Sequence, residues 1–408
     1  MRELSYPKNK INVLLLEKVD KIAFDLFKEE GYNVESLDGS LSEKDLIKKI
    51  KDVSILGIRS KTIISDKVIK SANKLLAIGA FCIGTNQIKF ESCNDSGIVV
   101  FNAPYSNTRS VVEIVIAQII NLMRKIVIKS NNMHSGVWRK DSLDSFEIRN
   151  KVIGIVGYGN IGSQLSVICE ALGMKVLYYD IVDKLSIGNA KKCKSLNDLL
   201  KNSDIVSLHV DGKKSNTNLI SDKEFRIMKE KSILVNYSRG NVVDIDSLIK
   251  NIKSKKLMGA ALDVFPEEPS NNKEKFKSKV KGIEEIILSP HIGGSTKEAQ
   301  KNIGSYVPDK IIDFINSGNT SSSVNFPKLS LPEQSDSHRL IHIHKNQPGV
   351  MLKINKIISE YNINIKGQYL KTNEEIGYVI TDIDSVYNKE VVKSLKNIPA
   401  TIKLRVLY

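Results

Sequence analysis

The chain has 408 residues, 41% of them hydrophobic, and a formal net charge of +15 at pH 7. This length excludes a single small module and predicts two or three domains, each with its own core. The charge would suit a nucleic-acid-binding protein, but the excess is mostly lysine scattered along the chain, with no basic helix or aromatic-interleaved patch. We therefore expect no nucleic acid as a partner.

The first ten residues lack the apolar region of a signal peptide, and no stretch approaches 18 uninterrupted apolar residues. These features favour a cytoplasmic protein that does not bind a membrane. Four cysteines, Cys82, Cys93, Cys169 and Cys193, are widely spaced without a Cys-x-x-Cys pair. That spacing favours reduced thiols, and we expect no metal site.

The N-terminal quarter alternates apolar runs with lysine-rich helical segments, the runs lying at 13–16, 54–58, 75–78 and 98–101. This alternation predicts an α/β unit wound around a parallel sheet. A long helix is expected next, over 110–130.

A dinucleotide-binding pattern begins at the apolar run 151–156, which leads into Gly157-Tyr158-Gly159-Asn160-Ile161-Gly162. In such a pattern the first glycine permits a tight turn, the second lets the backbone approach a pyrophosphate at the helix N-terminus, and the third lets helix and strand pack closely. A second apolar run, 176–179, ends at Asp180, where a carboxylate accepts the ribose hydroxyls and disfavours a 2′-phosphate. The pattern therefore predicts NAD rather than NADP, and a purely structural glycine turn is the weaker alternative.

Further apolar runs at 205–209, 233–236, 259–263 and 285–288 predict a second parallel sheet, so two doubly wound units follow one another. The loops after the last three runs carry Arg239, Glu268 and His291. An arginine can grip a substrate carboxylate, and a histidine can take the hydroxyl proton when a hydride leaves C2 of a 2-hydroxy acid. A carboxylate on the other ring nitrogen fixes the tautomer and raises the histidine pKa. Taken singly, a packed histidine and a solvated glutamate are the plainer interpretations, but the nearby dinucleotide pattern favours catalysis.

The polar stretch 317–337 predicts a linker. The remaining residues then follow a βαββαβ order, the ferredoxin-like arrangement, with strands at 339–344, 363–370, 376–383 and 401–407 and helices at 349–361 and 389–396. So small a sheet has open edges and favours pairing with a second copy. His342 and His344 share one face of the first strand, but they lack a third ligand for a metal.

The glycine motif, together with Ser238-Arg239-Gly240, Glu268-Pro269 and Pro290-His291, resembles the D-isomer-specific 2-hydroxyacid dehydrogenases over about residues 10–325. The C-terminal part resembles an ACT domain, a regulatory fold that binds amino acids between paired copies. The combination is similar to the bacterial D-3-phosphoglycerate dehydrogenases. It implies a flavodoxin-like substrate domain (1–106 and 295–332), a Rossmann NAD domain (107–294) and an ACT domain (338–408).

The implied reaction is the NAD-dependent oxidation of 3-phospho-D-glycerate to 3-phosphooxypyruvate, the first step of L-serine biosynthesis, with L-serine as effector and a homo-oligomer, a tetramer, as the assembly. The implied catalytic residues are Arg239, Glu268 and His291. The implied cofactor contacts are Gly157, Tyr158, Gly159, Asn160, Ile161, Gly162, Asp180, Ser238, Asp263 and His291. The implied substrate contacts are Arg59, Ser60, Lys61, Ile83, Gly84, Asn107 and Arg239, with Trp138 and Lys140 reaching toward a neighbouring subunit. The implied serine contacts are His344, Asn346 and Asn364.

Bacterial relatives of this type often carry a Gly-Gly hinge before the ACT domain, whereas this chain has Ser335-Asp336-Ser337, which leaves the strength of serine inhibition open. Two other functions also stay open. One is a dehydrogenase acting mainly on another acid, such as 2-hydroxyglutarate or glycerate. The other is a non-catalytic NAD-sensing protein, like the transcriptional corepressors of the same fold.

Overall fold

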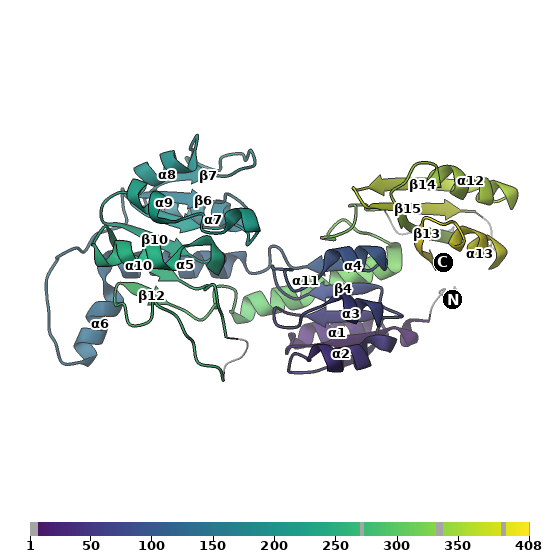
Figure 1. Cartoon of the computed structure of the whole chain (residues 1–408), viewed down its shortest axis with the longest axis horizontal. Coiled ribbons are helices and arrows are strands. Elements are labelled where there is room, and N and C mark those ends of the chain that lie inside the picture. The colour runs from purple at the N-terminus through teal and green to yellow at the C-terminus, as the bar shows by residue number, and fades with distance from the viewer. Residues whose placement is uncertain (1–6, 270–272, 332–337, 385–388, 408) are drawn as a thin grey trace. The chain divides into compact units, whose positions relative to one another are not determined.

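The computed structural model describes residues 7–269, 273–331, 338–384 and 389–407 (Figure 1). The chain divides into two compact units. Residues up to 106 together with those from 300 onward form the first, and residues 107–299 form the second. The three-domain boundaries given above stay a prediction. The junction at 335–337 lies outside the described residues.

The first unit begins with a five-stranded parallel sheet in the order β2-β1-β3-β4-β5. Its strands are β1 (Asn12–Leu15), β2 (Asn33–Ser36), β3 (Ile55–Ile58), β4 (Ala77–Ala80) and β5 (Val99–Asn102). Its helices are α1 (Lys21–Glu29), α2 (Glu43–Lys49), α3 (Asp66–Lys70) and α4 (Phe90–Asp95). This is the flavodoxin-like order, in which ligands bind where the strand order reverses, here between β1 and β3. The edge strand β2 was not anticipated, because its mostly exposed residues form no apolar run.

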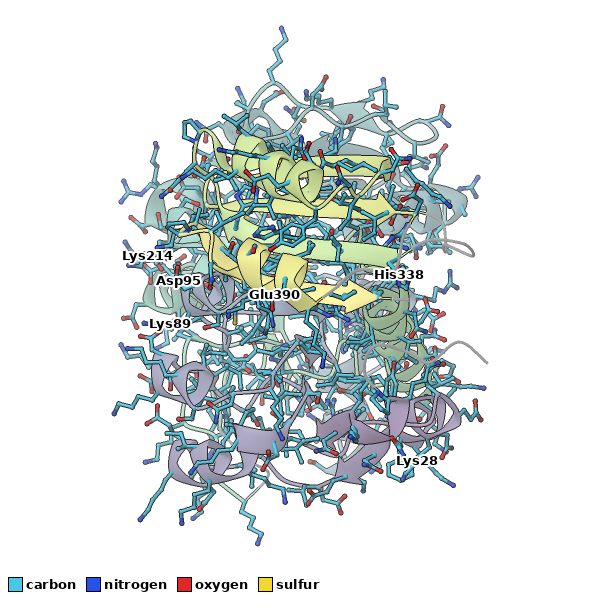
Figure 2. The ribbon with its side chains drawn as sticks, turned by 90° about the vertical axis from the view of Figure 1, so that its right-hand side faces the viewer. Lys28, Lys89, Asp95, Lys214, His338 and Glu390 are labelled. Atoms are coloured by element: carbon cyan, nitrogen blue, oxygen red, sulfur yellow. The ribbon has the colours of Figure 1, made fainter. Side chains whose placement is uncertain are left out.

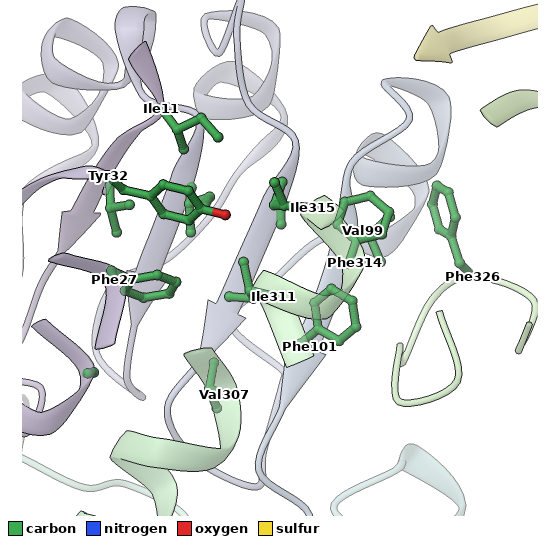
Figure 3. Packing of buried hydrophobic residues seen from close by; sticks show 14 of the residues in the cluster. Ile11, Phe27, Tyr32, Val99, Phe101, Val307, Ile311, Phe314, Ile315 and Phe326 are labelled. Atoms are coloured by element: carbon green, nitrogen blue, oxygen red, sulfur yellow. The ribbon is translucent and has the colours of Figure 1, made fainter. Parts of the chain in front are cut away.

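A long helix, α11 (Lys297–Ser317), supplies much of the core of this unit. Val307, Ile311 and Phe314 of the helix belong to the same buried cluster as Val99 and Phe101 of the sheet, as Figure 3 shows. The rings of Phe101 and Phe314 lie 5.8 Å apart, centroid to centroid. The return of the chain through α11 therefore completes the N-terminal core.

The second unit holds a seven-stranded parallel sheet in the order β12-β11-β10-β9-β6-β7-β8. Its strands are β6 (Val152–Val156), β7 (Lys175–Tyr179), β8 (Lys191–Lys192), β9 (Ile205–Leu208), β10 (Ser232–Asn236), β11 (Leu257–Leu262) and β12 (Ile286–Leu288). Its helices are α5 (Thr108–Arg124), α6 (Ile126–His134), α7 (Asn160–Ala171), α8 (Leu196–Asn202), α9 (Asp222–Ile227) and α10 (Ile245–Lys253). Apart from the added strand β12, this is the Rossmann order. The single helix expected over 110–130 is in fact two, because Lys125 adopts a left-handed conformation (φ 53°) that ends α5.

The C-terminal part is a four-stranded antiparallel sheet in the order β14-β15-β13-β16. Its elements are β13 (His338–Lys345), α12 (Val350–Glu360), β14 (Ile365–Thr372), β15 (Ile376–Ile383), α13 (Lys389–Lys396) and β16 (Thr401–Leu407). Side chains from α12 and α13 form a buried cluster with one face of the sheet. The predicted fold class, two doubly wound parallel sheets and a ferredoxin-like βαββαβ module, is confirmed.

The opposite face of this sheet is also covered. Ile343 and Tyr378 join the same cluster as Phe314 of α11 and Phe326. The stretch after α11, predicted as a linker, is packed in its described part. Its polar groups are satisfied internally, as where the Thr320 hydroxyl donates to the Pro327 carbonyl over 2.7 Å. The sequence reads as polar there because buried hydrogen bonds hold the segment together with only a few apolar side chains, Phe326 and Leu329 among them.

Charged side chains point outward from several elements in Figure 2, among them Lys28 of α1, Lys89 before α4 and Glu390 of α13. Lys89 pairs with Asp66 at 3.1 Å. This distribution agrees with a basic excess spread over the surface. No helix in the described part of the chain is long and apolar enough to cross a membrane.

Candidate active site

The three predicted catalytic side chains follow three neighbouring strands of the Rossmann sheet. Arg239 comes after β10, Glu268 after β11 and His291 after β12, and β11 lies between the other two. Because parallel strands end at the same edge of a sheet, these loops converge outside their carboxyl ends. The fold thus brings together residues that are 52 positions apart at most in the chain, counted from 239 to 291.

His291 and Glu268 form a hydrogen-bonded pair. Nδ1 of His291 lies 2.7 Å from Oε2 of Glu268, and the side chains are 49% and 33% exposed. The hydrogen bond to Glu268 raises the pKa of His291 above its ordinary value. Burial opposes ionisation of Glu268, but the hydrogen bond from His291 and its charge bring the net pKa of Glu268 below the ordinary value. With Nδ1 held by the carboxylate, Nε2 is the ring nitrogen left for proton exchange.

The loop that carries His291 is held from beneath by Asp263, which is 2% exposed. One carboxylate oxygen accepts hydrogen bonds from the Ser289 hydroxyl at 2.6 Å and the Ile292 amide at 2.9 Å, and the other accepts from the Gly293 amide at 2.8 Å. His291 itself has φ 53°, an uncommon conformation for a side chain of its size. Asp263, predicted as a cofactor contact, thus has a visible role in fixing the backbone around His291.

Arg239 is half-buried at the end of β10. Its Nη1 donates to the Ser238 carbonyl at 2.6 Å, and the side-chain Nδ2 of Asn236 donates to the Arg239 carbonyl at 3.0 Å. Ser238, another predicted cofactor contact, is buried and donates from its hydroxyl to Asn236 at 2.7 Å. The positive charge of Arg239 adds to the lowering of the pKa of Glu268 and partly opposes the rise in the pKa of His291, so the three groups share one electrostatic environment.

The three glycines of the dinucleotide pattern have different surroundings. Gly157 has φ 93°, and a Cβ atom there would lie 2.4 Å from the carbonyl oxygen of His209. A Cβ at Gly162 would lie 2.2 Å from the carbonyl oxygen of Gly157. Around Gly159, the N-cap of α7, nothing lies within 4 Å of such an atom. The turn and the close packing therefore require glycine, and the open space at the helix N-terminus fits a pyrophosphate.

The neighbouring predicted contacts are divided between core and surface. The Tyr158 side chain is buried and stacks on Tyr178 with 3.8 Å between centroids, so only its backbone is available at the cradle. Asp180 accepts the Tyr158 amide at 2.8 Å and the Val182 amide at 2.9 Å, one on each oxygen. Each of these oxygens keeps a lone pair for a ribose hydroxyl. Asn160 and Ile161 begin α7 and are not buried.

In the first unit, the predicted phosphate-binding loops follow adjacent strands. Arg59, Ser60 and Lys61 come after β3, and Ile83 and Gly84 come after β4. Two side chains that the sequence did not single out hold these loops. They are Glu17, which accepts the Lys61 and Thr62 amides, and Gln87, which donates to the Arg59 and Gly84 carbonyls. Glu17 directly follows an apolar run, so its position at a strand end was the available signal.

The other three predicted substrate contacts lie in the second unit. Asn107 lies against Gly294. A Cβ atom at position 294 would be 2.3 Å from Nδ2 of the Asn107 side chain. Its Oδ1 is buried and has no hydrogen-bond partner among the described residues. Trp138 is 76% exposed and Lys140 is also exposed, both in the stretch after α6.

The predicted serine contacts are not brought together within one chain. His344 lies opposite Gly377, is 2% exposed, and has Nδ1 at 2.7 Å from the Lys345 carbonyl. Asn346 donates to the Asn373 carbonyl near that same end of the sheet. Asn364 pairs with Asp384 just beyond the opposite end, where β14 and β15 meet at Ile365 and Ile383. The two ends are six residues of β13 apart, between His338 and His344, or roughly 20 Å.

Comparison with known proteins agrees with this architecture. Residues 116–293 match the D-isomer specific 2-hydroxyacid dehydrogenase, NAD binding domain, and residues 340–403 match the AHAS small subunit-like ACT domain. The crystal structure of D-lactate dehydrogenase with NAD+ from Lactobacillus jensenii is 28% identical, with a TM-score of 0.63 over 75% of this chain and 96% of that one.

Two full-length relatives are more similar in sequence. The D-3-phosphoglycerate dehydrogenase of Dictyostelium discoideum is 49% identical over 404 residues, 99% of each chain. That of Escherichia coli strain K12 is 46% identical over 411 residues, 100% of each. The nucleotide unit is thus an NAD-binding domain, and the chain belongs to the D-isomer specific 2-hydroxyacid dehydrogenase family, with the D-3-phosphoglycerate dehydrogenases as its full-length relatives.

Proposed function

We propose that this protein catalyses the NAD-dependent oxidation of 3-phospho-D-glycerate to 3-phosphooxypyruvate, the first step of L-serine biosynthesis. The observation that carries the proposal is the His291–Glu268 pair, 2.7 Å between Nδ1 and Oε2, at the strand ends that also carry Arg239. The full-length relatives named D-3-phosphoglycerate dehydrogenase support the choice of substrate.

The three residues divide the chemistry between them. Arg239 binds the substrate carboxylate through its guanidinium fork and so orients C2. His291 takes the C2 hydroxyl proton on Nε2, and Glu268 stabilises the imidazolium that forms. The glycine cradle at 157–162 and Asp180 would hold NAD, which would supply the acceptor for the C2 hydride. In the reverse direction His291 returns the proton to the carbonyl oxygen of the oxo acid.

The substrate phosphate requires cations in addition to Arg239. Arg59 and Lys61 supply them in this proposal, and backbone amides near Ile83 and Gly84 add hydrogen-bond donors. The proposed set of substrate contacts also includes Asn107, Trp138 and Lys140. Trp138 and Lys140 are exposed and in this proposal reach toward the active site of a neighbouring subunit.

L-serine is the proposed effector of the C-terminal module. The edge strand β14 is largely exposed, with Tyr369 and Leu370 among its side chains, and suits pairing with a second copy. Such pairing unites His344 and Asn346 of one subunit with Asn364 of the next. A second apolar surface, around Trp138, would close a homotetramer.

We also infer a cytoplasmic location, since all four cysteines are free thiols. Burial raises the pKa of Cys93 and of Cys169 to about 12, so these thiols stay protonated and unreactive.

The test is the initial rate of NADH oxidation with 3-phosphooxypyruvate, 2-oxoglutarate or hydroxypyruvate, each with and without L-serine. A fast reaction that prefers the phosphorylated acid and is inhibited by serine is the expected result. A preference for 2-oxoglutarate would instead make 2-hydroxyglutarate the substrate. NADH binding without oxidation of any of the three would favour a sensing protein instead.

A further inference from the structure

The strand order of the first unit reverses between β1 and β3, and two loops meet there. One follows β1 and contains Glu17 and Lys18. The other follows β3 and runs from Arg59 to Thr62. A hollow of about 510 Å³ opens beside them, and three cationic side chains, Lys18, Lys21 and Arg59, are among its lining residues. Ligands of open α/β sheets bind at such a position, and these cations would favour an anionic one.

Glu17 joins the two loops. Glu17 is only 7% exposed, which is uncommon for a residue with a carboxylate side chain. Oε1 accepts the Thr62 amide at 2.7 Å and Oε2 accepts the Lys61 amide at 3.0 Å. Both carboxylate oxygens thus hold backbone that is 44 and 45 residues away in the chain.

The local backbone at this carboxylate is unusual. Glu17 and Lys18 have φ values of 66° and 53°, the left-handed region that residues with side chains rarely adopt. Two such residues in succession cost free energy, and conformations of this kind cluster at functional sites. The turn directs Glu17 inward onto the second loop and leaves Lys18 at the hollow.

Gln87 holds the same loop from its other end. Its side-chain amide donates to the Arg59 carbonyl at 2.7 Å and to the Gly84 carbonyl at 3.3 Å. Arg59 is therefore tied to the loop after β4, while Lys61 is tied to the loop after β1. Between these two ties the Ser60 and Lys61 side chains are exposed.

We propose that Glu17 and Gln87 are positioning residues that hold the 59–62 loop in the conformation that binds the substrate phosphate. Neither side chain contacts the phosphate in this proposal, which rests on the proposed function. Both oxygens of the buried Glu17 carboxylate are occupied by backbone amides, so the use of this side chain is to order the backbone of the loop. Misplacing a binding loop by about 1 Å can cost up to 100-fold in rate.

The test compares Glu17→Gln with the unchanged protein. Glutamine has the same size but presents a donor where an amide N–H needs an acceptor, so one tie is lost. KM and kcat are measured with NADH for 3-phosphooxypyruvate and for hydroxypyruvate, which lacks the phosphate. The KM for 3-phosphooxypyruvate should rise by roughly 10- to 100-fold, whereas the KM for hydroxypyruvate and the affinity for NADH should stay nearly unchanged.

Gln87→Met provides a second variant. Methionine has a shape similar to that of glutamine but lacks the amide donor, and position 87 is half-buried. Thr320→Val is the matched control, because it removes a buried hydroxyl of the same unit that donates to the Pro327 carbonyl at 2.7 Å. Thermal unfolding of all three variants measures how much stability each one loses. Only the position 17 and 87 variants should lose preference for the phosphorylated acid.

An unchanged ratio of the two KM values in folded Glu17→Gln and Gln87→Met would overturn the inference while leaving the proposed function intact. Equal losses on both acids, matching those of Thr320→Val, would reduce Glu17 to a structural residue and overturn it as well. If the unchanged protein itself shows no preference for 3-phosphooxypyruvate over hydroxypyruvate, the proposed substrate fails and the inference fails with it.

Discussion

The edge of the Rossmann sheet and the C-terminal sheet differ in how much of a site one chain assembles. At the first, neighbouring parallel strands end together, so Arg239, Glu268 and His291 meet and are held by buried groups such as Asp263. At the second, antiparallel strands separate His344 from Asn364 by nearly the full length of the sheet. Parallel strands gather loops at one edge, whereas antiparallel strands send successive loops to opposite ends. A single chain therefore gathers the three proposed catalytic side chains, whereas it keeps the proposed serine contacts at opposite ends of a sheet.

The sharpest way to break this comparison is His291→Gln. If the catalytic group is complete and His291 is its base, turnover should fall by roughly 10²- to 10⁴-fold while NAD binding persists. Steady-state kinetics and NADH fluorescence titration measure the two effects. The control is His134→Gln on the exposed end of α6. Turnover that survives in the position 291 variant would remove this histidine as the base.

Glu268→Gln tests whether the carboxylate sets the working pH. Oxidation needs neutral His291, whose pKa is raised above 6.5 by Glu268, so the rate should rise with pH through that raised value. Without the carboxylate the midpoint should move to lower pH, and the loss in rate should be smaller than for His291→Gln. The pH profile of kcat/KM for 3-phosphoglycerate reports this pKa in the free enzyme. A midpoint that does not move would contradict the pairing.

Gly162→Ala and Gly159→Ala separate folding from cofactor binding at the same edge. The methyl group at 162 would meet the Gly157 carbonyl at 2.2 Å, so the variant should lose about 1–3 kcal/mol of stability. At 159 the space is open, so stability should hold while NAD affinity falls, because the methyl occupies room meant for the pyrophosphate. Thermal unfolding and NADH titration distinguish the two. Normal NAD affinity in Gly159→Ala would place the pyrophosphate elsewhere.

The effector positions should give the smallest effect, seen only with serine present. His344→Gln and Asn364→Ala should each weaken serine inhibition, since each would damage every site shared between two copies. Mixed oligomers of the two variants should regain part of the serine sensitivity, because half of their shared sites contain both native residues. Serine inhibition curves on co-expressed, doubly tagged oligomers measure this. No recovery in the mixture would indicate a site within one chain.

Much of the arrangement at the carboxyl ends of β10, β11 and β12 was predictable, because the sequence features that indicate it lie close together in the chain. Each strand that positions Arg239, Glu268 or His291 is an apolar run, and each side chain follows its strand closely. The glycine pattern likewise specified a turn whose close contacts the structure shows at Gly157 and Gly162. Less predictable were the break at Lys125, where nothing in the apolar pattern marks the left-handed residue, and the burial of the segment after α11.

The sequence by itself determined the two parallel sheets, the βαββαβ module and the placement of Arg239, Glu268 and His291 after β10, β11 and β12, because hydrophobic period and strand-end position are read from a few consecutive residues. Only the tertiary structure decided that Asp263 holds the His291 loop, that Glu17 and Gln87 hold the Arg59 loop, and that His344 and Asn364 lie apart. These outcomes depend on hydrogen bonds between residues far apart in the chain, and such partners are chosen by the packed fold rather than by any local pattern.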